Sequence, residues 1–227
     1  MPSPPEWTRR GFLAAGAALA TACGRKPAEG FQGIACVALA GDRAIAVVDL
    51  LAFTLRHNIP LSCRPSALLA HPTPERPAAF AAGTTEGGSA LLERVDLAAR
   101  KVVARVFVGQ GAPVVRTDPR GFVWSAAGEP KLRAWHADGL RPGPQLNLAA
   151  RALDFDLSPV APLACVCLEG GFVQFADLAS GKVSGPVRCG ADASAARFRQ
   201  DGRVVMVACR GESLLRVFDT PSRRIMT

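Results

Sequence analysis

Cysteine has the widest chemistry of the side chains in this sequence, because its thiolate is a nucleophile, a metal ligand and a disulfide partner. Cys165 and Cys167 are separated by one residue within an apolar run, and on a strand this spacing points both side chains to one face. A C-x-C pair without companion histidines is a weak zinc motif, whereas free cysteine packs as a small apolar residue. We therefore expect core packing, with one disulfide or a metal site as alternatives, for Cys36, Cys63, Cys165, Cys167, Cys189 and Cys209.

Cys63 and Cys189 are the preferred participants if a disulfide forms, because both are predicted to lie in loops that join successive repeat units. Their units are not neighbours, so we do not expect these two cysteines to bond to each other. The seventh cysteine, Cys23, is a candidate for lipidation. Its modification would leave six cysteines, an even number, in an oxidising compartment.

The three histidines lie at different places in the repeat, which argues against a shared metal site. His57 follows Arg56 in a predicted outer strand, where we expect a solvated surface position. His136 stands where other units have a strand-ending aspartate and is expected to cap a turn. His71 begins a proline-rich turn that would face one mouth of a ring-shaped fold. No metal ligands are expected.

Other catalytic and cofactor motifs are missing from the sequence. There is no Ser-His-Asp spacing and no G-x-S-x-G elbow. Gly109-x-Gly111 lies between predicted strands and not before a helix, so it is not a dinucleotide-binding motif. We expect no cofactor, and the chain is more typical of a binding protein than of an enzyme.

The N-terminal residues form a targeting segment. Adjacent arginines precede an apolar run over residues 11–22, which is too short to cross a bilayer. The pattern resembles the twin-arginine export signal, and the residues that carry the resemblance are Arg9, Arg10, Phe12 and Leu13. The resemblance implies export to the periplasm or cell envelope.

Ala20-Thr21-Ala22-Cys23 is similar to a bacterial lipoprotein cleavage site, at which Cys23 would be acylated and would anchor the protein to a membrane. A lipoprotein site more often has leucine where Ala20 stands, and Ala20-x-Ala22 also suits the ordinary signal peptidase. We assign residues 1–23 to the signal and 24–33 to a linker.

The net charge of +8 comes from arginines that are spread over turns and not gathered with aromatic residues. Nucleic-acid binding needs a dense basic surface, so no nucleic acid partner is expected. The charge favours solubility and weak attraction to anionic envelope surfaces.

Residues 151–189 predict the unit from which the rest of the chain is built. Apolar stretches broken by Ser-Pro, Gly-Gly and Ser-Gly turns indicate four antiparallel strands in about 40 residues, the pattern of one propeller blade. The four predicted strands are Ala152–Leu157, Leu163–Leu168, Phe172–Phe175 and Val183–Val187.

The unit repeats along the chain. A strand ends in aspartate at Asp49, Asp96, Asp177 and Asp219, with His136 in the same place, at spacings of 47, 40, 41 and 42 residues. Counting back ten residues from Asp177 and Asp219 predicts equivalent positions for Cys167 and Cys209. The repeat units are residues 34–63, 64–110, 111–149, 150–190 and 191–227.

Asp118-Pro119-Arg120-Gly121 and Gln200-Asp201-Gly202-Arg203 have β-turn chemistry between apolar strands. With Val204–Ala208 and Leu215–Thr220 they resemble the bacterial Tyr-Val-Thr-Asn-repeat and lactonase-like seven-bladed propellers. The resemblance spans about residues 34–227, although the namesake tetrapeptide is absent. It implies an all-β propeller of four-stranded blades and says little about function.

The first unit supplies only three strands, so about 19 strands are expected, just under five blades. A ring with a missing strand leaves an exposed edge. We therefore expect an incomplete, truncated seven-bladed ring, with a five-bladed ring as the alternative.

The predicted function is an exported propeller scaffold, monomeric, that binds an unidentified protein or small molecule through its loops. A lactonase-type hydrolase is the first alternative; the carboxylates on or beside predicted first strands, where such a fold would place catalytic groups, are Asp118, Asp154 and Asp156. A periplasmic redox partner is the second alternative.

Overall fold

The computed structural model describes residues 33–71 and 77–226. The predicted signal residues Arg9, Arg10, Phe12, Leu13 and Cys23 lie outside the described residues. Within these, the all-β prediction is confirmed, because the regular structure consists of strands and a single 3₁₀ turn, η1 (Arg210–Glu212). No helix in the described part is long and apolar enough to cross a membrane.

The described chain forms 19 strands in five antiparallel sheets, and strands that follow each other in sequence are neighbours in each sheet. Sheet 1 has three strands and the other sheets have four. Sheet 1 contains β1 (Ile34–Leu39), β2 (Ala44–Asp49) and β3 (Thr54–Pro60). Sheet 2 contains β4 (Arg64–Ala70), β5 (Ala78–Thr84), β6 (Ser89–Asp96) and β7 (Lys101–Gln110).

Sheets 3 to 5 follow the same plan. Sheet 3 contains β8 (Val114–Asp118), β9 (Phe122–Ala126), β10 (Lys131–His136) and β11 (Pro142–Asn147). Sheet 4 contains β12 (Ala152–Leu157), β13 (Leu163–Leu168), β14 (Phe172–Asp177) and β15 (Val187–Arg188). Sheet 5 contains β16 (Ala193–Phe198), β17 (Val204–Cys209), β18 (Leu214–Asp219) and β19 (Arg224–Ile225).

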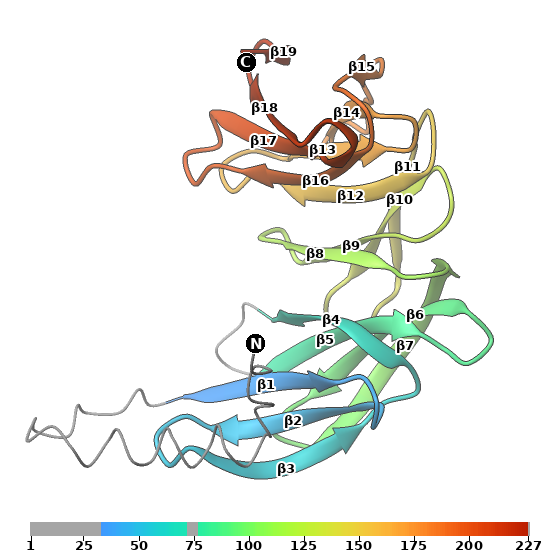
Figure 1. The fold of residues 1–227 in the computed structure, drawn as a ribbon. Coiled ribbons are helices and arrows are strands. Elements are labelled where there is room, and N and C mark those ends of the chain that lie inside the picture. Colours follow the sequence, from blue (N-terminus) through green and yellow to red (C-terminus); the bar gives the residue numbers. More distant parts are fainter. Residues whose placement is uncertain (1–32, 72–76, 227) are drawn as a thin grey trace, which may run out of the picture.

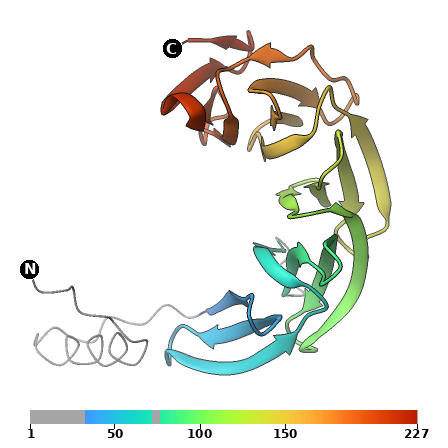
Figure 2. The same ribbon diagram turned by 45° about the vertical axis from the view of Figure 1, so that its right-hand side comes forward.

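The five sheets follow one another along an open arc (Figures 1 and 2), and the first strands of neighbouring sheets lie next to each other on its concave side. Each of the four sheet-to-sheet interfaces holds its own cluster of buried apolar side chains. The middle strands of a sheet contribute side chains to two clusters, because alternate side chains point to opposite faces. In β13, for example, Val166 packs toward sheet 3 and Cys165 toward sheet 5. The architecture is consistent with a propeller-like fold.

The strand-ending aspartates that mark the repeat close the turn that follows them. Asp49 accepts the backbone N–H groups of Leu51 and Ala52, and Asp177 accepts those of Ala179 and Ser180. These hydrogen bonds favour the carboxylate and lower the pKa of Asp177. The aspartates therefore mark the turn between the last two strands of sheets 1, 2, 4 and 5.

His136 takes the same position in sheet 3 without the same contact. Its ring lies against Phe122 with centroids 4.8 Å apart, and the turn is closed by the Leu140 N–H, which donates to the His136 carbonyl at 2.8 Å. The side chain thus packs on an aromatic neighbour, while the backbone closes the turn.

The prediction of a fourth strand over residues 183–187 is wrong for most of its length. Only Val183 forms an isolated bridge, with Ala176, and β15 is the two-residue strand Val187–Arg188. The Ser184 hydroxyl accepts the N–H of Phe175, and Pro186 has no N–H to donate. A side chain and a proline therefore interrupt the ladder.

The predicted equivalence of Cys167 and Cys209 is also wrong, by one residue. Leu163 pairs with Asp177, and Val204 pairs with Asp219, which makes Ala208 the counterpart of Cys167. The loop between β17 and β18 is one residue longer than the loop between β13 and β14, because it contains η1.

Candidate functional site: an arginine–aspartate cluster beside a hairpin pocket

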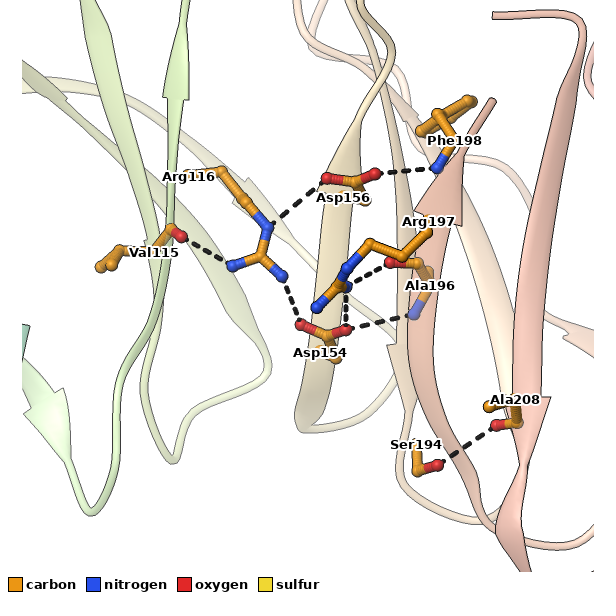
Figure 3. Close-up of polar contacts among 9 residues, drawn as sticks. All are labelled: Val115, Arg116, Asp154, Asp156, Ser194, Ala196, Arg197, Phe198 and Ala208. Atoms are coloured by element: carbon orange, nitrogen blue, oxygen red, sulfur yellow. Dashed lines mark hydrogen bonds and ion pairs between the residues drawn. The ribbon is translucent and has the colours of Figure 1, made fainter. Parts of the chain in front are cut away.

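Charged side chains from three successive first strands meet on the concave side of the arc. We call Arg116 of β8, Asp154 and Asp156 of β12, and Arg197 of β16 the inner cluster (Figure 3). Asp154 and Asp156 are two residues apart on one strand, so both carboxylates point to the same face. Arg116 approaches them from sheet 3 and Arg197 from sheet 5 (Figure 3).

Asp154 joins all three sheets. Its Oδ1 accepts a hydrogen bond from Arg116 Nη2 at 3.0 Å, and its Oδ2 accepts one from Arg197 Nη1 at 2.6 Å. The backbone N–H of Ala196 donates to the same Oδ2 at 3.1 Å. The Asp154 side chain is 10% exposed, so this carboxylate is a buried acceptor shared by two neighbouring sheets.

Asp156 repeats the arrangement one pleat further along β12. Its Oδ2 accepts the backbone N–H of Phe198 at 2.8 Å, and its Oδ1 lies 3.4 Å from Arg116 Nε. Arg116 also donates from Nη1 to the Val115 carbonyl at 2.8 Å. The Arg116 guanidinium is therefore held on three sides.

The inner cluster joins the first strands of three sheets through paired charges. It contains two carboxylates and two guanidiniums, and each carboxylate lies against an arginine and accepts a hydrogen bond from a backbone N–H. Arg197 keeps the largest exposed surface of the four, at 55% of its side chain, and presents positive charge to the concave side.

Asp118, the third carboxylate singled out from sequence, holds the first hairpin turn of sheet 3. It accepts the backbone N–H of Arg120 at 2.7 Å and the indole N–H of Trp124 at 3.2 Å, and the Arg120 guanidinium pairs with it. Burial alone would raise the pKa of Asp118, but these hydrogen bonds outweigh burial and leave it below its ordinary value. Asp118 does not join the inner cluster.

The turns next to Asp118 border a pocket between sheets 3 and 4. The hairpin pocket has a volume of about 310 Å³ and is lined by Asp118–Arg120, Leu157–Pro162, Leu178 and Ala179. Three prolines rigidify its walls. Val160 projects at its edge with 66% of its surface exposed.

The pocket wall also touches sheet 5. Gly202 lies so close to Val160 that a Cβ at position 202 would sit 2.3 Å from Val160 Cγ2, and its φ of +68° favours glycine. Ser158 is buried and accepts the N–H of Val160. The first hairpins of sheets 4 and 5 therefore brace each other.

Sequence reasoning missed a second set of inter-sheet contacts. Three residues before each strand-ending position, in sheets 2 to 5, a polar side chain binds the backbone of the preceding sheet's last strand or of the link that follows that strand. Gln174 accepts the Ala149 N–H at 2.9 Å, and Arg216 donates to the Cys189 carbonyl at 3.2 Å. The remaining members are Glu93, which accepts the Ser62 N–H, and Arg133, which donates to the Val108 carbonyl. These residues could have been found in the sequence, because each is a polar residue three positions before the strand-ending residue of a largely apolar strand.

The histidines remain apart, and the interpretation of His57 as solvated is wrong. Both His57 ring nitrogens are buried without a hydrogen-bond partner among the described residues, because His57 points to the same side of β3 as the buried Ile59. The His71 ring lies 5.5 Å from that of Phe80, and burial, with the nearby Arg94 charge, lowers its pKa. In the described ranges no three His, Cys, Asp or Glu side chains are arranged to hold a metal ion.

The cysteines of sheets 4 and 5 pack as expected in an apolar cluster. Cys165, Cys167, Cys189 and Cys209 share this cluster and are all free thiols, as are Cys36 and Cys63. Cys63 contacts the buried Glu93, and burial together with the Glu93 charge raises its pKa to about 12. Such thiols are poor nucleophiles in the folded protein.

Comparison with known proteins adds no family assignment: no protein-family model matches the chain, and no curated protein matches it.

Proposed function

We propose that the chain is part of a β-propeller, in which sheets 1 to 5 are consecutive blades around a channel lined by their first strands. The repeat of about 42 residues, the sequential antiparallel sheets and the separate apolar cluster at each interface support this proposal. The opening of the arc in Figure 2 leaves room for further sheets, which suits a complete ring of about seven blades.

The proposed activity is binding. One observation carries this proposal: a preformed pocket lies beside a rigid part of the fold. The carboxylates of the inner cluster pair with arginines and join three first strands, and the adjoining first hairpins line the hairpin pocket. Rigid pockets of about this size accept small ligands or a single projecting side chain. We assign the hairpin pocket to an apolar group of a protein or small molecule.

A lactonase-type activity is the alternative that a direct assay separates from binding. We expect no turnover when the purified chain is incubated with a panel of sugar lactones, because its inner carboxylates are already paired. Turnover that Asp156→Asn abolishes would replace the scaffold proposal with a hydrolase. Asp138→Asn, an exposed aspartate that pairs with Arg141, is the matched control.

Export and lipid anchoring belong to the same proposal and rest on Arg9, Arg10, Phe12, Leu13 and Cys23. Expressed in a bacterium with the twin-arginine pathway, the full chain should fractionate with membranes, and Cys23→Ser should release it into the periplasm. Equal distribution of the two proteins would refute the anchor. Retention of Arg9→Lys/Arg10→Lys in the cytoplasm tests the export route separately.

A further inference from the structure

Two thiols from different elements lie almost in bonding contact at the interface of sheets 4 and 5. Cys189, in the link that enters sheet 5, and Cys209, the last residue of β17, have their Sγ atoms 3.1 Å apart. This separation is about 1 Å longer than a disulfide bond. Both side chains are buried. We propose that Cys189 and Cys209 form a disulfide that fastens the entry link to the first hairpin of sheet 5.

The surrounding contacts aim Cys189 at Cys209. The Cys189 N–H donates to the Gly171 carbonyl of sheet 4 at 2.9 Å, and the Cys189 carbonyl accepts Arg216 Nε of sheet 5. At the next position, a Cβ would sit 3.2 Å from Cys209 Sγ, so Gly190 lets the link cross directly over that thiol. The backbone of the link is therefore held from both sides.

The other cysteines of the cluster are worse partners. Cys165 and Cys167 are two apart on one strand, and side chains at that spacing stand too far apart for the Cβ separation that a disulfide needs. Cys189 and Cys209 are 20 residues apart in sequence. Their bond would enclose all of β16 and β17, including Arg197 of the inner cluster.

Formation of the bond is an exchange with a disulfide donor, for which oxidised glutathione serves as the reagent. The Cys189 thiolate attacks one glutathione sulfur, and the first glutathione leaves as a thiolate. The Cys209 thiolate then attacks the Cys189 sulfur and releases the second glutathione. Two protein thiols are oxidised, one glutathione disulfide is reduced, and the two protons pass to the departing thiolates.

Burial, together with the adjacent Cys209 thiol, raises the pKa of Cys189 well above its ordinary value, so the thiolate is scarce in the folded chain. Because the thiolate is the attacking species, exchange should be slow in the native protein and fast during refolding. Once formed, the buried bond should resist reductant until the protein unfolds.

A peptide map tests the bond directly. The full chain is refolded with a mixture of oxidised and reduced glutathione, alkylated, and digested with trypsin without reduction. We expect residues 189–197 linked to residues 204–210, each of which contains one cysteine. Cys165 and Cys167, which share the peptide of residues 152–182, should be alkylated. Alkylation of both Cys189 and Cys209, or a link from either to another cysteine, would overturn the proposal.

Melting temperatures provide a second readout. Oxidised wild-type protein should melt about 5–10 °C above the reduced protein, because the bond restrains a 20-residue loop of the unfolded chain. Cys189→Ala and Cys209→Ala should lose this difference, and the matched variant Cys167→Ala should retain it. An equal difference in all three variants would contradict the assignment, and the wild-type peptide map decides the question if a variant fails to fold.

Discussion

The Asp154 carboxylate of β12 accepts the backbone N–H of Ala196 in β16 at 3.1 Å, which joins the first strands of two successive sheets through one side chain. Asp156 stands in the same relation to the N–H of Phe198, again 42 residues further along the chain. The first strands have no ladder hydrogen bonds to each other, because they belong to separate sheets. Side-chain acceptors therefore satisfy backbone donors that a continuous sheet would pair.

Removing Asp154 should destabilise the arc. Asp154→Ala leaves the Ala196 N–H without its acceptor and Arg197 without its carboxylate, and Arg116 keeps only its pair with Asp156. We expect the free energy of unfolding to fall by about 2–3 kcal/mol, measured by urea denaturation. Asp138→Ala is the matched control, because its pair with Arg141 is about 70% exposed on both sides and should change stability by less than about 0.5 kcal/mol. Equal losses of stability in the two variants would contradict the proposal that the inner cluster stabilises the contacts between sheets.

Gln174 should contribute more to the free energy of unfolding than a side chain with a single hydrogen bond. It accepts the Ala149 N–H and donates to the Ser184 carbonyl, both at the edges of sheet 4. Gln174→Ala should cost about 1–2 kcal/mol in urea denaturation, because it leaves both backbone groups unpaired. The exposed Gln200, in the turn after β16, offers a control, and Gln200→Ala should be close to neutral. A neutral Gln174→Ala would mean that the link from β11 to β12 is held by backbone contacts alone.

Acid should weaken the sheet 3 hairpin through Asp118. Its pKa lies below the ordinary 3.8 in the folded chain, so the unfolded chain binds the proton first. The stability that this carboxylate contributes is present above about pH 4 and is lost as the pH falls below that value. Asp118→Asn should flatten the decline of melting temperature between about pH 4 and pH 2. An unchanged acid decline in the variant would assign acid sensitivity to other carboxylates.

Much of this fold was predictable from sequence, since Asp49, Asp96, Asp177 and Asp219 mark turns whose carboxylates cap local backbone. Local hydrogen bonding repeats wherever the sequence repeats. The inner cluster was not predictable in this way: Arg116, Asp154 and Arg197 meet only because of the relative placement of three sheets. The single inserted residue at η1 shifted the predicted partner of Cys167.

The hairpin pocket was not predictable from the sequence for the same reason. Asp118 and Ser158-Pro159 were recognisable as turns, but nothing in one turn indicates that its neighbour stands close enough to enclose a volume. The prediction that His57 is solvated failed for a similar reason. Whether a side chain on an outer strand is exposed depends on whether the neighbouring sheet covers that face, and the sequence of one strand does not show this. Contacts between sheets depend on twist and spacing, which a one-dimensional pattern does not contain.

A dye titration tests the binding proposal most directly. The fluorescent probe 1-anilinonaphthalene-8-sulfonate, which brightens in apolar sites, is titrated into the wild-type chain, Val160→Asp and Leu51→Asp. Val160 borders the hairpin pocket, and the similarly exposed Leu51 lies in a turn of sheet 1 far along the chain. We predict saturable one-site binding that Val160→Asp weakens at least about tenfold, or about 1.4 kcal/mol, and that Leu51→Asp leaves unchanged. Binding that is equal in all three proteins, or absent from wild type, would contradict a preformed pocket at this site.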